Sequence, residues 1–142
     1  MTLKRKDFRS NFEFNIARVL TTKGIKFEYE SQSYEYTKKV YRPVCLECGS
    51  KKVVSTHKYT PDFFLPNGIV IETKGKVTPS VRTNLLEIHE AMKEQGVDWR
   101  LVFMRDNWLT KKRTKRLSDW AEDNGIKYFV GRIPDEWLKE KK

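Results

Sequence analysis

One short segment restricts the fold of this chain more than any other: two apolar runs that flank a turn, with acidic residues beyond their outer ends. Residues 63–65 and 69–71 are apolar, and the Pro-Asn-Gly triplet between them is a turn signal for a hairpin. Asp62 precedes the first run, and Glu72 and Lys74 follow the second on one face of an alternating strand. The segment therefore predicts a two-stranded ribbon whose open end gathers two carboxylates and one ammonium group.

The spacing of Asp62, nine intervening residues and Glu72-Thr73-Lys74 is typical of metal-dependent enzymes that cut DNA. Carboxylates suit Mg²⁺, which can generate a nucleophilic hydroxide and stabilise charge on the attacking and leaving oxygens of a phosphodiester. An adjacent lysine can position water or stabilise the transition state. The alternative is a surface hairpin in which Glu72 and Lys74 form a solvated pair worth less than about 1 kcal/mol. The apolar strands and the rest of the chain favour phosphodiester hydrolysis.

Length and charge narrow the class of protein further. The 142 residues are predicted to form one domain with a real core, over 1–142. Lys and Arg number 29 against 19 Asp and Glu, and the net charge of +10 is expected of a protein that binds a phosphate backbone. No apolar run reaches membrane-spanning length, and the N-terminus lacks a signal-peptide core. We therefore expect a soluble, cytoplasmic protein without a membrane partner.

The order of apolar patterns predicts a mixed α/β fold, with a sheet flanked by helices. A capping box at residues 10–13 opens the first helix, and Lys23-Gly24 ends it. Residues 43–56 form an irregular insertion that contains two cysteines. Helices are predicted over residues 10–24, 79–96, 111–124 and after 134, and strands over residues 25–30, 34–41, 63–65, 69–74, 99–104 and 126–130.

Several separated stretches, in order from about residue 8 to residue 140, carry a resemblance to one known family. They are Phe8-Arg9-Ser10 with Glu13, Gly24-Ile25-Lys26-Phe27-Glu28-Tyr29-Glu30, Tyr59-Thr60-Pro61-Asp62-Phe63, Leu65-Pro66-Asn67-Gly68-Ile69 running into Glu72-Thr73-Lys74-Gly75, Gly125-Ile126-Lys127-Tyr128, and Ile133-Pro134-Asp135-Glu136-Trp137-Leu138-Lys139-Glu140. Together they resemble the phage endonuclease I family, Holliday-junction resolvases with the restriction-endonuclease-like fold of PD-(D/E)xK nucleases. The resemblance implies an intertwined, domain-swapped homodimer. It also implies a metal-dependent endonuclease that makes paired nicks in four-way and other branched DNA.

The resemblance implies roles for individual residues as well. Asp62 and Glu72 match the central metal ligands and Lys74 the catalytic lysine, with Mg²⁺ as the cofactor and Mn²⁺ as a substitute. Glu13 matches a further carboxylate ligand, contributed by the partner chain, and Glu28 matches another family glutamate. The residues themselves offer plainer interpretations, because Glu13 also completes the capping box and Glu28 is also an ordinary exposed strand glutamate.

Cys45 and Cys48 depart from the family pattern, in a stretch between residues 30 and 59 that is longer than expected. The Cys-x-x-Cys-Gly spacing resembles one knuckle of a zinc ribbon, but a structural zinc needs four ligands. Three interpretations stay open: a Cys₄ zinc shared by two chains, a zinc completed by His57 and another ligand, or two thiols without metal. A redox role is disfavoured, since no thioredoxin-like pattern surrounds the pair.

Basic residues outside the hairpin are candidates for contact with DNA phosphates. Most of them belong to the predicted helix over residues 111–124, and the alternative is a solvated helix face. The four tryptophans are expected in the core or an interface rather than as platforms for stacked bases. The DNA-binding candidates are Arg9, Lys76, Lys112, Arg113, Lys115 and Arg116.

The interpretation that we favour is a Mg²⁺-dependent endonuclease that resolves four-way junctions. One alternative keeps the fold and changes the substrate, as in a mismatch-repair or restriction-type nuclease. The other is a non-catalytic zinc-knuckle DNA-binding module, organised by the cysteine pair. That last alternative leaves the arrangement of Asp62, Glu72 and Lys74 unexplained.

Overall fold

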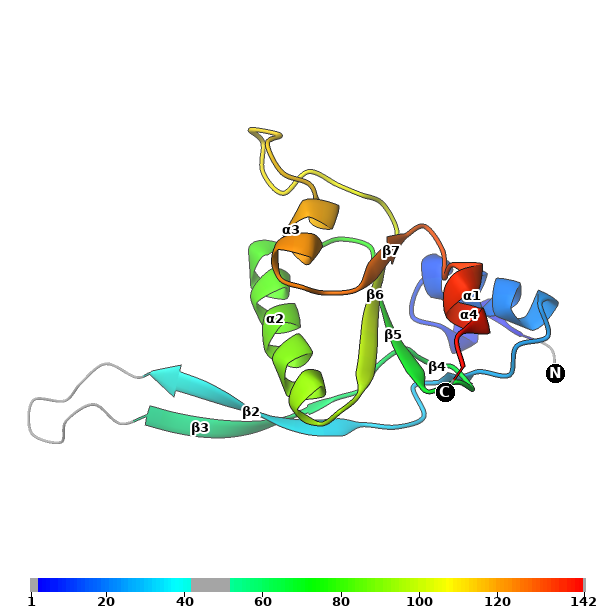
Figure 1. Ribbon diagram of the computed structural model, residues 1–142, viewed down its shortest axis with the longest axis horizontal. Helices are drawn as coiled ribbons and strands as arrows, with labels where there is room; N and C mark the ends of the chain where they lie inside the picture. The colour runs from blue at the N-terminus through cyan, green and yellow to red at the C-terminus, as the bar shows by residue number, and fades with distance from the viewer. Residues whose placement is uncertain (1–2, 42–51, 142) are drawn as a thin grey trace, which may run out of the picture.

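A five-stranded mixed sheet lies at the centre of the computed structural model, which describes residues 3–41 and 52–141 (Figure 1). In the order β1-β4-β5-β6-β7, the pairs β1–β4 and β4–β5 are antiparallel, and the pairs β5–β6 and β6–β7 are parallel. Strands β2 and β3 pair with each other in a separate antiparallel hairpin. The strands are β1 (Glu28–Tyr29), β2 (Tyr34–Tyr41), β3 (Lys52–Tyr59), β4 (Phe63–Phe64), β5 (Ile69–Lys74), β6 (Asp98–Phe103) and β7 (Tyr128–Val130). The mixed α/β sheet predicted from the sequence is confirmed.

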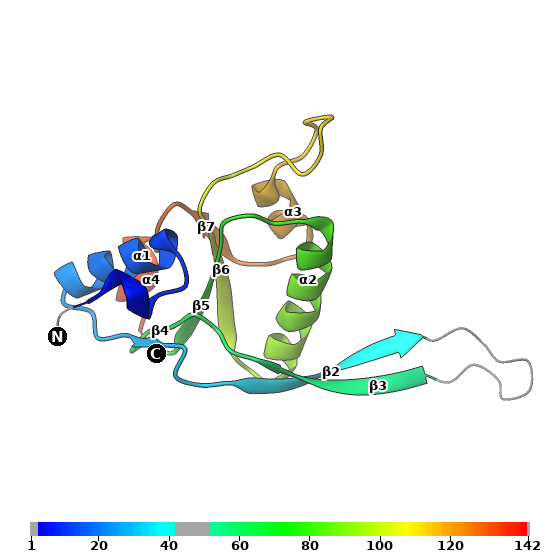
Figure 2. The same cartoon turned by 180° about the vertical axis from the view of Figure 1, so that it is seen from behind.

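Helices cover both faces of this sheet (Figures 1 and 2). The longest helix, α2, lies with α3 over one face, and α1 lies with α4 over the other, so the sheet separates two buried apolar clusters. Within the described ranges, no helix is apolar over enough residues to reach across a membrane. The helices are the 3-10 helix η1 (Arg5–Asp7), α1 (Asn11–Thr22), α2 (Pro79–Glu94), α3 (Leu117–Asp123) and α4 (Asp135–Lys139).

The hairpin predicted from the sequence forms between β4 and β5. Phe63 pairs with Ile71, and the side-chain oxygen of Asn67 accepts a hydrogen bond from the Ile69 amide at 3.2 Å. Gly68 takes a φ of 91°, a left-handed conformation that glycine adopts without strain. Because β5 lies between β4 and β6, it is buried on both faces up to its last residue. The polar side chains of Glu72 and Thr73, just before that last residue, are therefore held inside the fold.

Two predicted elements are shorter in the structure. The helix predicted over residues 111–124 is wrong in its first part, since α3 begins at Leu117 and the preceding basic residues form an exposed loop. Cations spaced by four residues, such as Lys111 and Lys115, repel each other on a helix, and only the residues from Leu117 onward bury apolar side chains. The strand predicted over residues 25–30 is shorter in the structure: β1 covers Glu28–Tyr29, and it ends there because Glu30 takes a left-handed φ of 49°.

The hairpin of β2 and β3 projects from the body of the molecule (Figure 1). Tyr36 and Tyr59 are buried at its base beside α2, and the Gln95 amide donates to the Glu35 carbonyl at 2.9 Å. The irregular insertion predicted over residues 43–56 is wrong at its end, since β3 begins at Lys52. Residues 52–59 contain Val53, Val54, Thr56 and Tyr59, and β-branched and aromatic residues of this kind favour a strand.

A buried arginine joins the centre of the sheet to the C-terminal segment. Arg100 of β6 has 2% of its surface exposed, and its guanidinium bonds Asp98 at 2.8 Å and Glu140 at 2.5 Å. The same guanidinium lies 5.1 Å from the centroid of the Trp137 ring. These contacts satisfy a charge that is costly to bury alone, and they hold α4 against β6.

Candidate active site

Asp62 lies just before β4, opposite the carboxyl end of β5. Its Oδ2 atom accepts two hydrogen bonds from Thr73, one from the backbone amide at 2.8 Å and one from the hydroxyl at 2.7 Å. Only 8% of Asp62 is exposed. Because both bonds use the same oxygen, β5 fixes the orientation of this carboxylate.

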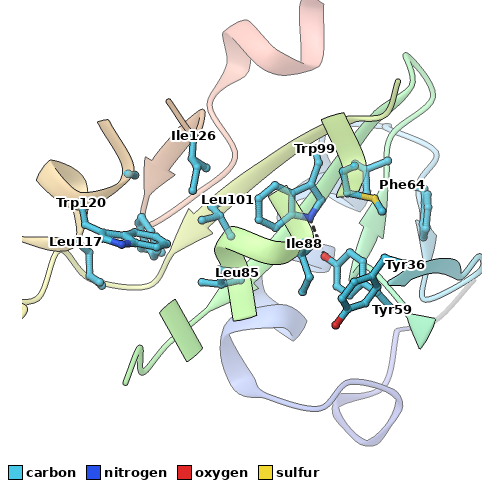
Figure 3. Close-up of a cluster of buried hydrophobic side chains, with 14 residues drawn as sticks. Tyr36, Tyr59, Phe64, Leu85, Ile88, Trp99, Leu101, Leu117, Trp120 and Ile126 are labelled. Carbon is cyan, nitrogen blue, oxygen red and sulfur yellow. Dashed lines mark hydrogen bonds between the residues drawn. The ribbon is translucent and has the colours of Figure 1, made fainter. Parts of the chain in front are cut away.

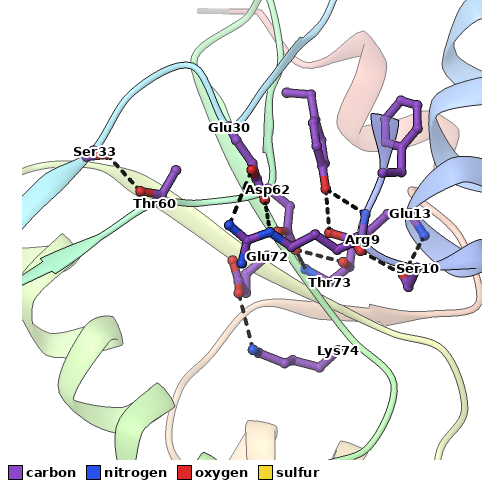
Figure 4. A network of polar contacts seen from close by, with 12 residues as sticks. Arg9, Ser10, Glu13, Glu30, Ser33, Thr60, Asp62, Glu72, Thr73 and Lys74 are labelled. Carbon is purple, nitrogen blue, oxygen red and sulfur yellow. Dashed lines mark hydrogen bonds and ion pairs between the residues drawn. The ribbon is translucent and has the colours of Figure 1, made fainter. Parts of the chain in front are cut away.

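Glu72 and Thr73 are successive residues of β5, so their side chains lie on opposite faces of the strand. Its Oε2 atom accepts a hydrogen bond from the Tyr59 hydroxyl at 2.7 Å. Its Oε1 atom lies 3.4 Å from the Lys74 ammonium, a contact that Figure 4 shows. Glu72 is 6% exposed, whereas Lys74 reaches toward solvent with 31% of its side chain exposed. The hairpin therefore brings Asp62, Glu72 and Lys74 together, as the sequence predicted.

Glu13 joins these residues from the first turn of α1. Its amide donates to Ser10 Oγ at 3.2 Å, which caps the helix, and the Ser10 hydroxyl donates in turn to Glu13 Oε2 at 2.7 Å. The Tyr29 hydroxyl donates to the other oxygen at 3.1 Å. Glu13 is thus part of the helix cap and is also 5% exposed beside Asp62, so the two interpretations of this residue are compatible. In the structure, Glu13 and Asp62 come from the same chain.

Glu30 is a fourth carboxylate of this group, and the sequence analysis assigned it no role. Its left-handed backbone lets its amide donate to the Asp62 carbonyl at 2.9 Å, while its carboxylate bonds Arg9 Nε at 2.8 Å. Strand alternation over residues 25–30 does not reveal this conformation. The signal that points to it is its position in the family-like stretch 24–30. Arg9, a predicted DNA contact, therefore lies at the edge of the carboxylate group.

Burial and mutual repulsion disfavour the charged forms of the two central carboxylates. Burial raises the pKa of Asp62 well above its ordinary range, the negative charge of Glu72 raises it further, and the two Thr73 hydrogen bonds oppose the change. Burial likewise raises the pKa of Glu72, against the lowering effects of Lys74 and the Tyr59 hydroxyl. Perturbed acids that share a cleft are typical of functional sites.

The carboxylates line a cleft of about 510 Å³ between the start of α1, the end of β5 and α2. One carboxylate oxygen from each of Glu13, Glu30 and Asp62 lies within 4.8 Å of the other two. Hard oxygen ligands gathered at this spacing suit a divalent cation such as Mg²⁺. This group includes Glu13 and Asp62 of the predicted ligands, whereas Glu72 lines the same cleft but is outside the group. The lining residues are Arg9, Ser10, Asn11, Phe12, Glu13, Tyr59, Thr60, Asp62, Glu72, Thr73, Lys74, Gly75, Asn84, Ile88 and Met104.

Comparison with known proteins identifies the family of this chain. The family model of phage endonuclease I matches residues 2–142. The chain belongs to the phage endonuclease I family. Endonuclease I of Escherichia phage T7 is 38% identical over 136 residues, which cover 95% of this chain and 80% of that relative. Endodeoxyribonuclease 1 of Enterobacteria phage T3 is 39% identical over 136 residues, which cover 95% and 79% of the two chains.

Glu28 lies apart from the cleft of this phage endonuclease I family member. It is exposed on β1 and accepts a hydrogen bond from the Ser31 hydroxyl at 2.8 Å. It lines a separate depression with Lys26 and the turn that joins β4 to β5. The structure therefore brings Glu30, and not Glu28, beside Asp62.

The basic residues predicted to contact DNA are all exposed. Arg9 lines the cleft, and Lys76 lies two residues after the end of β5. The other four occupy the loop between β6 and α3, which projects from the body in Figures 1 and 2; they are Lys112, Arg113, Lys115 and Arg116. Within this loop, the Arg116 guanidinium lies 4.2 Å from the centroid of the exposed Trp108 ring, and Lys115 pairs with Asp123 at 2.6 Å. Trp108 departs from the expected core position, whereas Trp99 and Trp120 are buried.

The cysteine pair falls outside the described residues, so the zinc interpretations stay predictions. His57 lies in β3, half-buried, with Nε2 2.8 Å from the Ser55 hydroxyl and its ring 5.7 Å from that of Tyr36. No group of three candidate metal ligands that includes His57 occurs among residues 3–41 and 52–141.

Proposed function

We propose that this chain is a Mg²⁺-dependent DNA endonuclease that nicks opposed strands at four-way junctions and other branched DNA. The observation that carries the proposal is the convergence of Glu13, Asp62, Glu72 and Lys74 in one cleft of a strongly basic protein. Family membership supports it, because the T7 and T3 relatives are named as an endonuclease and an endodeoxyribonuclease. Junction selectivity rests on the resemblance of the motifs to resolvases.

The carboxylates and the lysine of the cleft have different roles in the proposed hydrolysis. Asp62 and Glu72 would hold the cation, and Glu13, with its neighbour Glu30, supplies further oxygen ligands. When bound, Mg²⁺ provides charge neutralisation and acidifies water at the scissile phosphate. The Lys74 ammonium, next to Glu72 and partly exposed, is placed to stabilise negative charge that develops on the phosphate oxygens. Before a cation binds, those carboxylates that are ionised repel the phosphate backbone.

Paired nicks require two active sites, and a homodimer supplies them. The chain leaves the body along β2 and returns along β3, with the hydroxyls of Ser33 and Thr60 2.7 Å apart at the hairpin base. Domain swapping exchanges identical elements, so an exchange at this hairpin would rebuild the same contact between Glu13 and Asp62 from two chains. The place of the hairpin in the fold therefore supports the intertwined dimer implied by the family resemblance.

DNA affinity in this proposal comes from cations that flank the cleft and not from the carboxylates. Arg9 lies at the cleft edge, Lys76 follows β5, and the loop between β6 and α3 adds Lys112, Arg113, Lys115 and Arg116. All of these residues are exposed. Contacts of this kind position the duplex without reading its sequence.

A gel assay on a synthetic four-way junction, with a linear duplex of the same sequence as control, tests the function. We expect symmetrical nicks in the junction with Mg²⁺, none with a chelator, and little cutting of the duplex. Asp62→Asn, Glu72→Gln and Lys74→Ala are each expected to lose cleavage by about 10²-fold or more while they still bind the junction.

Other outcomes identify the alternatives. Equal cutting of junction and duplex would indicate a nuclease of another substrate class. Junction binding without cleavage under any divalent cation would indicate a non-catalytic DNA-binding module. Robust Mg²⁺-dependent cleavage by Asp62→Asn or Glu72→Gln would remove that residue from the metal site.

A further inference from the structure

Two hydrogen bonds in series lead from the apolar core to the Glu72 carboxylate. The Trp99 indole Nε1 donates to the Tyr59 hydroxyl oxygen at 2.7 Å, as Figure 3 shows. The Tyr59 hydroxyl then donates to Glu72 Oε2, also at 2.7 Å. The three residues come from β6, β3 and β5, so the series joins the projecting hairpin to the centre of the sheet.

The direction of both bonds follows from the chemistry of the groups. An indole N–H can only donate, so the Tyr59 oxygen must accept from Trp99. A phenol carries one proton, and Glu72 is the neighbour that can accept it. The Tyr59 hydroxyl is therefore the donor and Glu72 Oε2 is the acceptor of the second hydrogen bond.

The core prevents this series from rearranging. Tyr59 is 8% exposed and Trp99 is 5% exposed, and both rings pack in the cluster that contains Phe64 and Leu101. A buried ring of this size cannot change rotamer without displacing its neighbours. The Tyr59 oxygen is therefore a fixed point against which the Glu72 carboxylate is oriented.

The two oxygens of Glu72 consequently have different surroundings. Oε2 is taken by the buried hydroxyl, whereas Oε1 lies 3.4 Å from the partly exposed Lys74 ammonium at the cleft. A carboxylate that is held at one oxygen presents the other in a single direction. Partners that orient metal ligands in this way commonly contribute 10–100-fold to metal affinity or activity.

We propose that Tyr59 and Trp99 are positioning residues that set the Glu72 carboxylate for a divalent cation and leave Oε1 for that ion. The inference rests on the proposed function, because it assumes that Glu72 is a metal ligand. Neither residue needs to touch the substrate. The alternative is a structural role, in which the Tyr59 hydroxyl merely satisfies the buried Trp99 N–H.

Metal binding by the intact protein in the absence of DNA distinguishes these roles. Calorimetric titration with Mn²⁺ and Mg²⁺ is expected to show affinity about 10–100-fold weaker in Tyr59→Phe than in the wild type. Tyr128→Phe is the control, since it removes a hydroxyl from a tyrosine packed against the same cluster, whose bond goes to Glu122 outside the cleft lining. Its metal affinity should equal that of the wild type.

A cycle of variants tests whether the two residues act in series. Trp99→Phe should weaken metal binding in the same direction as Tyr59→Phe but by less, since the hydroxyl still reaches Glu72. The double variant, which leaves no orphaned indole N–H, should lose no more affinity than Tyr59→Phe. In cleavage assays, the half-saturating Mg²⁺ concentration should rise, while the maximal rate is recovered at saturating Mg²⁺.

A spectroscopic measurement on the wild type avoids dependence on variants that fold poorly. Addition of Mg²⁺ should shift the indole N–H resonance of Trp99 more than that of Trp120, which is also buried but lies outside the series. Suppose that the wild type binds metal. The proposed positioning role alone is then overturned if Tyr59→Phe has the same metal affinity as the wild type, or if the Trp99 resonance shifts no more than that of Trp120. Wild-type protein that neither binds metal nor cleaves DNA overturns the proposed function, and the positioning role falls with it.

Discussion

The buried carboxylates of Asp62 and Glu72 oppose folding unless a cation neutralises their charge. Asp62 and Glu72 are both nearly inaccessible, and each raises the energy of the charged form of the other. In the absence of metal, protonation is the remaining way to reduce that repulsion, which is why burial and neighbouring charge raise the pKa of Asp62. The residues that suit catalysis therefore weaken the metal-free fold.

Asp62→Asn removes this charge and keeps a hydrogen-bond acceptor for Thr73. Because folding raises the pKa of Asp62, the folded state binds more protons than the unfolded chain above about pH 4, and stability falls as the pH rises through that window. We expect the metal-free variant to exceed the wild type in free energy of unfolding by roughly 1–3 kcal/mol at pH 8, with a smaller difference at pH 5. Urea unfolding in chelator at both pH values measures the effect.

The exposed Asp7 of η1 provides a control for the loss of one negative charge. Asp7→Asn should unfold like the wild type at both pH values. An Asp62→Asn protein that is less stable than the wild type at pH 8 would show that the charged carboxylate stabilises the fold, against this prediction.

At the same scale, the sequence predicted those site residues that local geometry places. A hairpin turn and strand alternation are short-range rules, so Asp62, Glu72 and Lys74 were expected together. Glu30 and the bond between Tyr59 and Glu72 escaped prediction for other reasons. The first depends on a left-handed backbone that strand patterns do not reveal, and the second joins residues of different sheets.

Among the elements, the loop between β6 and α3 differs most from its prediction. The Asp106 carboxylate accepts from the Ser118 amide at 2.9 Å and the Asp119 carboxylate from the Arg116 amide at 2.9 Å, so α3 is capped where its apolar residues begin. Apolar periodicity placed Leu117 and Trp120 correctly, but it carries no information about where repelling cations stop a helix. The basic residues are thereby presented on an exposed loop.

Neutralising this loop should reduce the salt dependence of junction binding. Each phosphate contact contributes about 0.9 to the slope of log K against log salt concentration, so Gln at Lys112, Arg113, Lys115 and Arg116 should flatten the slope by about 2–4. Binding titrations from low to moderate salt measure it. A control with Gln at exposed lysines elsewhere changes net charge equally and should flatten the slope less; its positions are Lys26, Lys93, Lys127 and Lys139. Equal slopes in the two variants would mean that the loop is a solvated surface that does not contact DNA phosphates.

For the whole molecule, the central question is which chain supplies α1 to each cleft. The N-terminal segment reaches the sheet through the two-residue β1, which pairs with β4, and through apolar contacts of α1. In the structure, Glu13 meets Asp62 of its own chain. The same contact formed between two chains would make each active site composite.

Mixed dimers of Glu13→Gln and Asp62→Asn chains discriminate between the two arrangements. With composite sites, one site of the mixed dimer collects both substitutions and the other collects none, so single-strand nicking of a junction should return. Co-expression with two different tags and purification through both provides the mixed species. Verified mixed dimers that stay as inactive as each parent would mean that one chain builds each site.

Zinc content tests the cysteine pair at the same scale. A structural zinc needs four ligands and one chain offers two thiolates at Cys45 and Cys48, so we expect one zinc ion per two chains. Metal analysis of protein purified without chelator measures the ratio. One ion per chain would indicate His57 and a further ligand, and none would leave two ordinary thiols. Removing such a zinc should lower dimer stability more than the rate of cleavage.

The buried guanidinium of Arg100 has a consequence for the synthesis of the chain. Its partner Asp98 lies two residues away, but Glu140 is made 40 residues later. Until that carboxylate emerges from the ribosome, β6 cannot enter the centre of the sheet with its charge fully paired. We therefore expect a chain that ends before residue 140 to be less stable and more open to proteases than the full chain, because Arg100 then keeps Asp98 but loses Glu140.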